Sequence, residues 1–154
     1  MKAALLRFTS NGLLDTSFGV SGIVLTDFAP NNDYYSAVAM DSSNRLVAAG
    51  NGETWGDPNT IEDDFYQVVM ARYNTNGSLD INFGDGGKIS PLPRLFAEAA
   101  SAIGIQPDGK ILLAGESLSS IDRSYMAIWR FDENGAIDTP FGLSGWVTTD
   151  FGGK

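Results

Sequence analysis

The chain has 154 residues, of which 43% are hydrophobic, and this is enough for one compact unit with a buried core. Its net charge of −9 would repel nucleic acids, because affinity for them depends on Lys and Arg neutralising phosphates. The same charge disfavours anionic membrane surfaces, and no stretch approaches the ~18 apolar residues of a membrane span. The chain contains no Cys and no His, so thiolate sites are excluded and the commonest general base is missing.

The N-terminal residues are predicted to form a strand. Met1–Leu6 is too short for a signal peptide, and it aligns with strand residues later in the chain. The segment that follows, RFTSNGLLDTSFGVSG at 7–22, recurs at 72–87 and at 130–145. Each copy contains Arg with an aromatic residue, Asn-Gly, Leu or Ile followed by Asp, and then Phe-Gly. Such an internal repeat is the strongest architectural signal that a single sequence carries.

A second repeated segment sets the phase of the repeat. Residues 37–50 match residues 102–115 at an offset of 65, whereas Arg72 and Arg130 are 58 residues apart. The difference of seven residues therefore lies in Asn51–Asp64, which we interpret as a loop insertion rich in Gly, Asp, Glu, Asn and Pro.

Four short strands fit each period. In order of their place in the repeat, they are expected at Ser36–Met40 and Ser101–Ile105 (first), Leu46–Gly50 and Ile111–Gly115 (second), Ala3–Thr9, Val68–Asn74 and Met126–Asp132 (third), and Ile23–Phe28, Lys88–Leu92 and Trp146–Phe151 (fourth). Small residues at alternate positions place the first strand near an axis where strands crowd. The second strand is apolar throughout, so both of its faces should be buried. Pro91 and Pro93 place the fourth strand at the outer edge.

These features predict an all-β fold of β-propeller-type blades, each made of four antiparallel strands, with a stacked sandwich as the alternative. The chain would hold about two and a half repeats in a single repeat domain. Its parts are a half blade at 1–28, a blade at 29–92 and a blade at 93–154.

The repeated segments also resemble a known family, the bacterial delta-sixty repeats, in which a segment similar to that at 72–87 is followed by Gln-Pro-Asp-Gly-Lys and an apolar strand ending in Ala-Gly. Residues 72–87 and 106–115 match that pattern closely, and Asp41–Arg45 departs from it, which predicts a looser hairpin there. The resemblance implies a propeller-like domain of bacterial origin at the cell surface or outside the cell, with no general activity.

Two and a half repeats cannot close a ring, since propellers have roughly four to eight blades. Either the chain is a piece of a longer propeller polypeptide, which we favour, or it buries its open blade against a partner. The expected partners are therefore further repeats of the same polypeptide or another protein, with a homo-oligomer as one form. Neither nucleic acid nor membrane insertion is expected.

Three residue types recur at fixed spacing in every copy. The Arg and the Asp are eight residues apart, and the Phe comes three residues after the Asp. Repetition in every copy favours a structural role over a ligand site, because active sites rarely repeat with the fold. We therefore assign an ion pair and an anchoring wedge to Arg7, Asp15, Phe18, Arg72, Asp80, Phe83, Arg130, Asp138 and Phe141.

Other residues are candidates for a calcium or ligand-binding site, although they match no known motif. Asp80, Asn82 and Asp85 offer oxygen ligands for calcium, but their offsets miss the EF-hand spacing, so no cofactor is the main expectation. Function can also lie in the acidic insertion, because loops on a rigid scaffold commonly carry it. The binding candidates in the insertion are Trp55, Asp57, Glu62, Asp63 and Asp64.

The sequence thus predicts a non-catalytic repeat segment that acts as a structural scaffold or as a protein- or ligand-binding surface. One alternative is a carbohydrate-active enzyme or carbohydrate-binding module, with Asp63 and Glu116 as paired carboxylates and Trp55 as a stacking platform. Trp129 and Trp146 lie on predicted strands, where packing is the expected role. A second alternative is a self-assembling subunit that completes its open blade with a partner.

Overall fold

The computed structural model describes residues 1–28, 32–54, 65–89, 98–118 and 124–150, and within them the chain forms ten strands and no helix. The strands are β1 (Ala3–Leu6), β2 (Ile23–Thr26), β3 (Asp33–Met40), β4 (Leu46–Thr54), β5 (Phe65–Tyr73), β6 (Lys88–Ile89), β7 (Glu98–Ile105), β8 (Ile111–Leu118), β9 (Ser124–Phe131) and β10 (Trp146–Thr149). The described ranges contain no helix that is long and apolar enough to cross a membrane.

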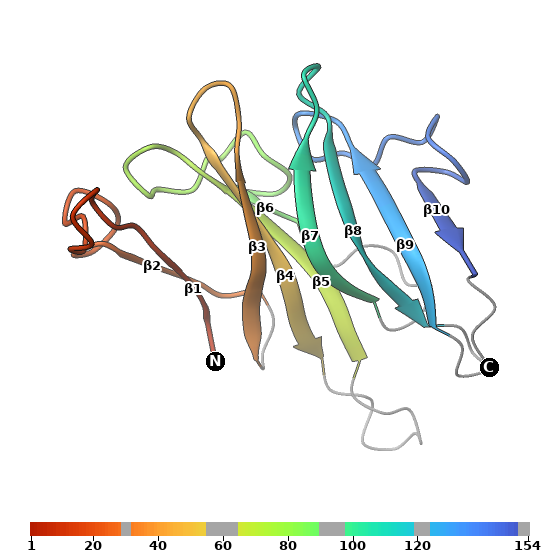
Figure 1. Ribbon diagram of the computed structural model, residues 1–154, viewed down its shortest axis with the longest axis horizontal. Coiled ribbons are helices and arrows are strands. Elements are labelled where there is room, and N and C mark those ends of the chain that lie inside the picture. The colour runs from red at the N-terminus through yellow and green to blue at the C-terminus, as the bar shows by residue number, and fades with distance from the viewer. Residues whose placement is uncertain (29–31, 55–64, 90–97, 119–123, 151–154) are drawn as a thin grey trace.

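The strands form three antiparallel sheets that stand side by side (Figure 1). One sheet has the order β3-β4-β5-β6, the second has the matching order β7-β8-β9-β10, and β1 pairs with β2 alone. We refer to these as blade 1, blade 2 and the half blade. The predicted all-β, propeller-type fold and the outermost position of the fourth strand are confirmed, because β6 and β10 lie at the sheet edges. Pro91 and Pro93 lie outside the described residues.

The core lies between neighbouring blades rather than within one sheet. Val47, Met70 and Phe83 of blade 1 pack against Trp129 and Phe131 of blade 2 in one apolar cluster. A second cluster joins blade 1 to the half blade. The second strand of blade 1 therefore has both faces buried, as its uninterrupted apolar sequence predicts.

The predicted strand bounds need correction at the insertion. The segment Asn51–Thr54 belongs to β4 and pairs with β5 as far as Phe65, so the insertion begins after Thr54 and not after Gly50. The cause is an extended hairpin: once β5 begins at Phe65, its backbone pairs with four more residues of β4. Among the third strands, β1 is shorter than predicted because it ends at Leu6, whereas β5 and β9 begin earlier than predicted, at Phe65 and Ser124.

Each first strand carries a register shift beside a glycine of the second strand. The shift lies between Tyr35 and Ala37 in blade 1, and β7 has one at the same place. A Cβ added at Gly50 would overlap the Tyr34 carbonyl oxygen and would lie 2.6 Å from the Tyr35 Cα atom. The glycine is therefore required by the close approach of two backbones, as is usual at a β-bulge.

Candidate functional site

The recurring Arg, Asp and Phe-Gly residues form one compact structure in each copy, which we call the clasp. In blade 1 the chain folds back after β5, so that the Asp80 amide donates to the Arg72 carbonyl and the Phe83 amide donates to the Asp80 carbonyl. The Arg72 Nε atom then donates to the Asp80 carboxylate at 2.8 Å, and its guanidinium lies 4.7 Å from the centre of the Phe83 ring. The other copies repeat this geometry, with Arg–Asp distances of 2.9 Å (Arg7–Asp15) and 2.6 Å (Arg130–Asp138).

The clasp also binds the next repeat in the chain. The Nη1 atom of Arg72 donates to the Glu133 carbonyl, and the Gly84 amide donates to the Asn134 carbonyl at 2.9 Å. Both acceptors belong to the Asn-Gly turn of blade 2. The clasp thus joins successive blades, in addition to forming the ion pair within its own blade that the sequence predicts.

The half blade makes the same two contacts with blade 1. The Nη1 atom of Arg7 donates to the Thr75 carbonyl, and the Gly19 amide donates to the Asn76 carbonyl at 2.8 Å. Phe18 is fully buried beneath this contact. Two interfaces within one chain therefore share a single design, in which two donors of one repeat meet two turn carbonyls of the next.

A second cation reaches the clasp carboxylate in both full blades. Arg45 of the β3–β4 turn lies 3.0 Å from Asp80, and Lys110 of the β7–β8 turn lies 3.1 Å from Asp138. Burial alone would raise the pKa of Asp80, but the Asn82 amide and the two guanidiniums outweigh it and hold the pKa below its usual value. The bonds from Lys110 and then Arg130 lower the pKa of Asp138.

The β3–β4 turn is well ordered, contrary to the looser hairpin that its sequence predicts. Asp41 accepts hydrogen bonds from the Ser43 and Arg45 amides at 2.9 Å each and from the Arg45 Nε atom at 2.7 Å. Asn44 takes the left-handed conformation, with φ 59°, that Gly109 provides in the other turn. Asp and Asn thus replace Pro-Asp-Gly, because both residue types favour turns through their side chains.

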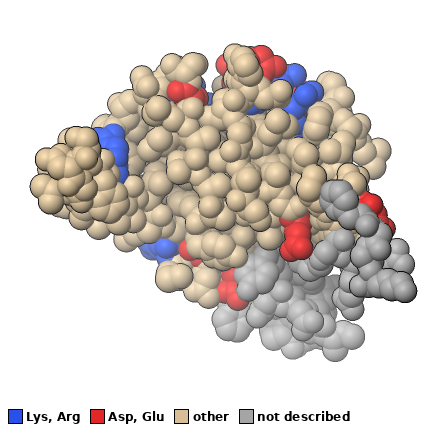
Figure 2. All heavy atoms as spheres, viewed as in Figure 1, with Lys and Arg blue, Asp and Glu red and all other residues tan. Residues whose placement is uncertain are grey.

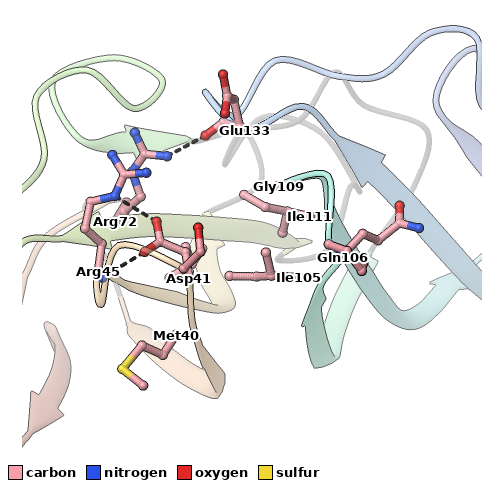
Figure 3. Close-up of a pocket in the computed structure, with 12 residues that line it drawn as sticks. Met40, Asp41, Arg45, Arg72, Ile105, Gln106, Gly109, Ile111 and Glu133 are labelled. Carbon is pink, nitrogen blue, oxygen red and sulfur yellow. Dashed lines mark hydrogen bonds and ion pairs between the residues drawn. The ribbon is translucent and has the colours of Figure 1, made fainter.

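A pocket of about 280 Å³ opens between the two turns that join the first and second strands (Figure 3). Arg45, Asp41 and Arg72 line one side, and Ile105 and Ile111 line the other. The charged groups on the first side bond to one another and to Asp80, which leaves no free nucleophile or acid–base pair among them. The pocket is a cleft between packed blades.

The calcium candidates are placed around the clasp. Both oxygens of Asp80 already accept hydrogen bonds, from Arg72 and Arg45 at one oxygen and from the Asn82 amide at the other. The Asp85 amide pairs with Lys88 in a tight turn. No group of three or more acidic residues in the described ranges could hold a metal ion. A calcium site at these residues stays a prediction.

The binding candidates of the insertion, Trp55, Asp57, Glu62, Asp63 and Asp64, lie outside the described residues. Glu116, the proposed partner of Asp63, is exposed on β8. Trp129 and Trp146 belong to the apolar cluster between the blades, and the packing role expected of them is confirmed.

Sequence reasoning missed a hydroxyl network that joins the half blade to blade 1. The Tyr73 hydroxyl bonds to the Thr26 hydroxyl on one side and to the Tyr35 hydroxyl, at 2.5 Å, on the other. Burial raises the pKa of both tyrosines. The only sequence signal is that the other copies carry Phe8 and Phe131 where this copy has Tyr73.

Comparison with protein families gives a match to a domain of unknown function described as a β-propeller (DUF5122), over residues 2–18, 42–83 and 106–141. No curated protein and no solved structure matches the chain. The matched segments make up more than half of the chain and contain the Arg, Asp and Phe of all three clasps. The chain therefore belongs to this β-propeller family of unknown function.

Proposed function

We propose that this chain is a non-catalytic scaffold, which acts by packing its open blades against protein. The observation that carries the proposal is an apolar face on the half blade. Phe8 is 57% exposed, whereas Tyr73 and Phe131, at the same place in the full blades, are 0% and 1% exposed. Leu6 is 46% exposed, and its counterpart Trp129 is 3% exposed.

This face has the composition of an interblade surface. Ala4, Leu6 and Phe8 lie on the side of the half blade that faces away from blade 1, and we call them the N-terminal face. In blade 2 the same three positions are Ala127, Trp129 and Phe131, all buried against blade 1. Figure 2 shows few charged side chains over the half blade at the left of the view. Contiguous exposed apolar surface of this kind marks a protein contact.

The far side of blade 2 has a matching open surface, which we call the C-terminal face. Its members are the counterparts of blade 1 residues that are buried against blade 2: Leu112, Ala114, Met126, Ile128 and Phe141. Met126 is 43% exposed, whereas its counterpart Val68 is 2% exposed. The two open faces therefore lie at opposite ends of the chain (Figure 1).

The use of the charged residues supports a scaffold over an enzyme. Every recurring Arg and Asp takes part in a clasp, and the clasps of Arg7 and Arg72 hold neighbouring blades together. The carbohydrate alternative has no described observation in its favour, because Asp63 and Trp55 lie outside the described residues. A location outside the cell or at its surface, which the family resemblance implies, forms part of the proposal.

The proposal is tested by extending the chain. A copy of residues 93–150 joined after Asp150 continues the repeat in phase and would cover the C-terminal face. In repeat proteins each added interface raises stability. We expect a single melting transition that lies about 5 °C or more above that of the original chain, corresponding to about 2 kcal/mol.

The matched control is the same extended chain with Met126→Glu, which puts a charge in the new interface. This variant should lose most of the gain. If the extended chain melts in two independent steps, with the first at the original temperature, the open face does not pack against a further blade and the scaffold proposal fails.

A further inference from the structure

The two open ends of the chain carry complementary hydrogen-bonding groups. At the C-terminal end, Arg130 binds Asp138 through Nε, but its Nη1 atom has no acceptor in the described part of the chain. The Gly142 amide likewise has no acceptor there. These two groups are the counterparts of the Arg72 Nη1 atom and the Gly84 amide, which bind the turn of the next blade.

The N-terminal end offers the missing acceptors. The turn Ser10-Asn11-Gly12 is the counterpart of Glu133-Asn134-Gly135, whose first two carbonyls accept the bonds from blade 1. Across the described ranges, no hydrogen bond reaches the Ser10 or Asn11 carbonyl. Two donors at one end of the molecule therefore match two acceptors at the other.

The glycine of this turn shows that the surface around it is open. A Cβ added at Gly77 would lie 2.7 Å from the Gly19 amide nitrogen, and one added at Gly135 would lie 2.9 Å from the Phe83 ring. A Cβ added at Gly12 would meet nothing within 4 Å. Each turn glycine is thus packed against the Phe-Gly of the preceding repeat, except the first.

Building on the proposed scaffold function, we propose that the occupant of these ends is a second copy of this chain, docked head to tail. The Asn-Gly turn and N-terminal face of one copy lie on the clasp and C-terminal face of the next. Arg130 and the Gly142 amide donate to the Ser10 and Asn11 carbonyls, and Phe8 of one copy packs near Leu112 of the other, as Phe131 and Val47 pack in the cluster between the blades. The half blade lacks first and second strands, so this contact reproduces the outer half of the interblade interface.

Such a contact is heterologous, because two different surfaces meet, and it leaves one donor end and one acceptor end open in every oligomer that does not close into a ring. The chain should therefore form a concentration-dependent series of oligomers. Raising the ionic strength should strengthen the association, since each copy carries a net charge of −9 that salt screens.

The test uses sedimentation velocity of the full chain over a wide range of concentration. Gly12→Asn adds a side chain where the partner's Phe-Gly would sit, and Asn tolerates the positive φ of 80° at this position. We expect the variant to weaken association by at least about tenfold, which is a typical effect of overpacking. The matched control is Gly86→Asn, which also has a positive φ of 58° and open space around it but lies away from both ends.

A mixing experiment checks the head-to-tail geometry. Leu112→Glu puts a charge in the C-terminal face near the clasp and should also weaken association. Because each variant keeps one intact end, an equimolar mixture of Gly12→Asn and Leu112→Glu should form a dimer and stop there. This dimer would not form if two identical faces met.

Two results would overturn the proposal. One is a wild-type chain that stays monomeric at the highest concentration reached. The other is a Gly12→Asn chain that is folded by circular dichroism and associates as strongly as the wild type. Neither result affects the covalently extended chain, so failure of self-docking can be told apart from failure of the scaffold function.

Discussion

Replacing Asp80 by Asn removes the charge at the centre of the best-buried clasp. The Asp80 carboxylate bonds to Arg72 at 2.8 Å and to Arg45 at 3.0 Å, and Arg72 is only 3% exposed. The substitution keeps the size of the side chain, so the effect reports the charge. It leaves the Arg72 guanidinium buried beside the Phe83 ring and a neutral amide.

The expected decrease in the free energy of unfolding follows from this burial. Removing one partner of a buried ion pair costs about 3–5 kcal/mol. The remaining amide oxygen still accepts one hydrogen bond and Arg45 is partly exposed, so we expect a loss of about 3 kcal/mol, at the lower end of that range. For a chain of this length, that lowers Tm by about 6–12 °C.

The assay is thermal and urea unfolding followed by circular dichroism. The matched control is Asp15→Asn, which makes the same chemical change in the half blade. Asp15 and Arg7 are both partly exposed, and exposed ion pairs contribute little, so the control should shift Tm far less. Equal shifts for the two variants would refute the argument that burial, rather than the repeated pattern itself, gives the clasp its strength.

Three further predictions follow from other contacts. The folded-state pKa of Asp80 is lowered, so its ionised form stabilises the fold above about pH 4. This stabilisation is lost as the pH falls through the folded-state pKa. The difference in urea midpoint between wild type and Asp80→Asn should therefore shrink on acidification. Gly115→Ala should lower the free energy of unfolding by about 2 kcal/mol or more, since the added Cβ would overlap the Ala99 carbonyl oxygen. Gly104→Ala is the control, because a Cβ there meets open space, and it should leave Tm nearly unchanged. Equal losses of stability in the two variants would contradict this prediction. Tyr73→Phe should lower the free energy of unfolding by about 1–2 kcal/mol, because the Thr26 hydroxyl loses its partner. An unchanged urea midpoint would show that the hydroxyl network adds no stability.

The repeat determines everything that depends on spacing within one copy. Arg72 and Asp80 are eight residues apart, so any fold that turns the chain back after the third strand brings them together, and the ion pair follows from sequence. The strand order and the edge position of β6 follow in the same way, from apolar runs and proline positions. The strand ends were misjudged, because pairing between neighbours, as at Thr54 and Phe65, decides where a strand stops. The β3–β4 turn was also misjudged, because the Asp41 side chain holds it together in place of Pro-Asp-Gly.

Contacts between copies could not be read from the sequence. The sequence of the repeat does not show that Arg72 reaches the Glu133 carbonyl or that the Gly84 amide reaches the Asn134 carbonyl, since these contacts depend on how one blade lies on the next. The exposure of the N-terminal face also depends on which blade lies next to it. Phe8 and Phe131 occupy the same position in similar local sequences, yet one is exposed and the other is buried.

The sequence by itself therefore determined the blade, because backbone pairing and turn chemistry act over short separations that recur in every copy. The tertiary structure decided which copies of the blade are covered. Burial is a property of the neighbours that a residue meets, and the same residue in the same local fold lies in a core between two blades or on a surface at the end of the row.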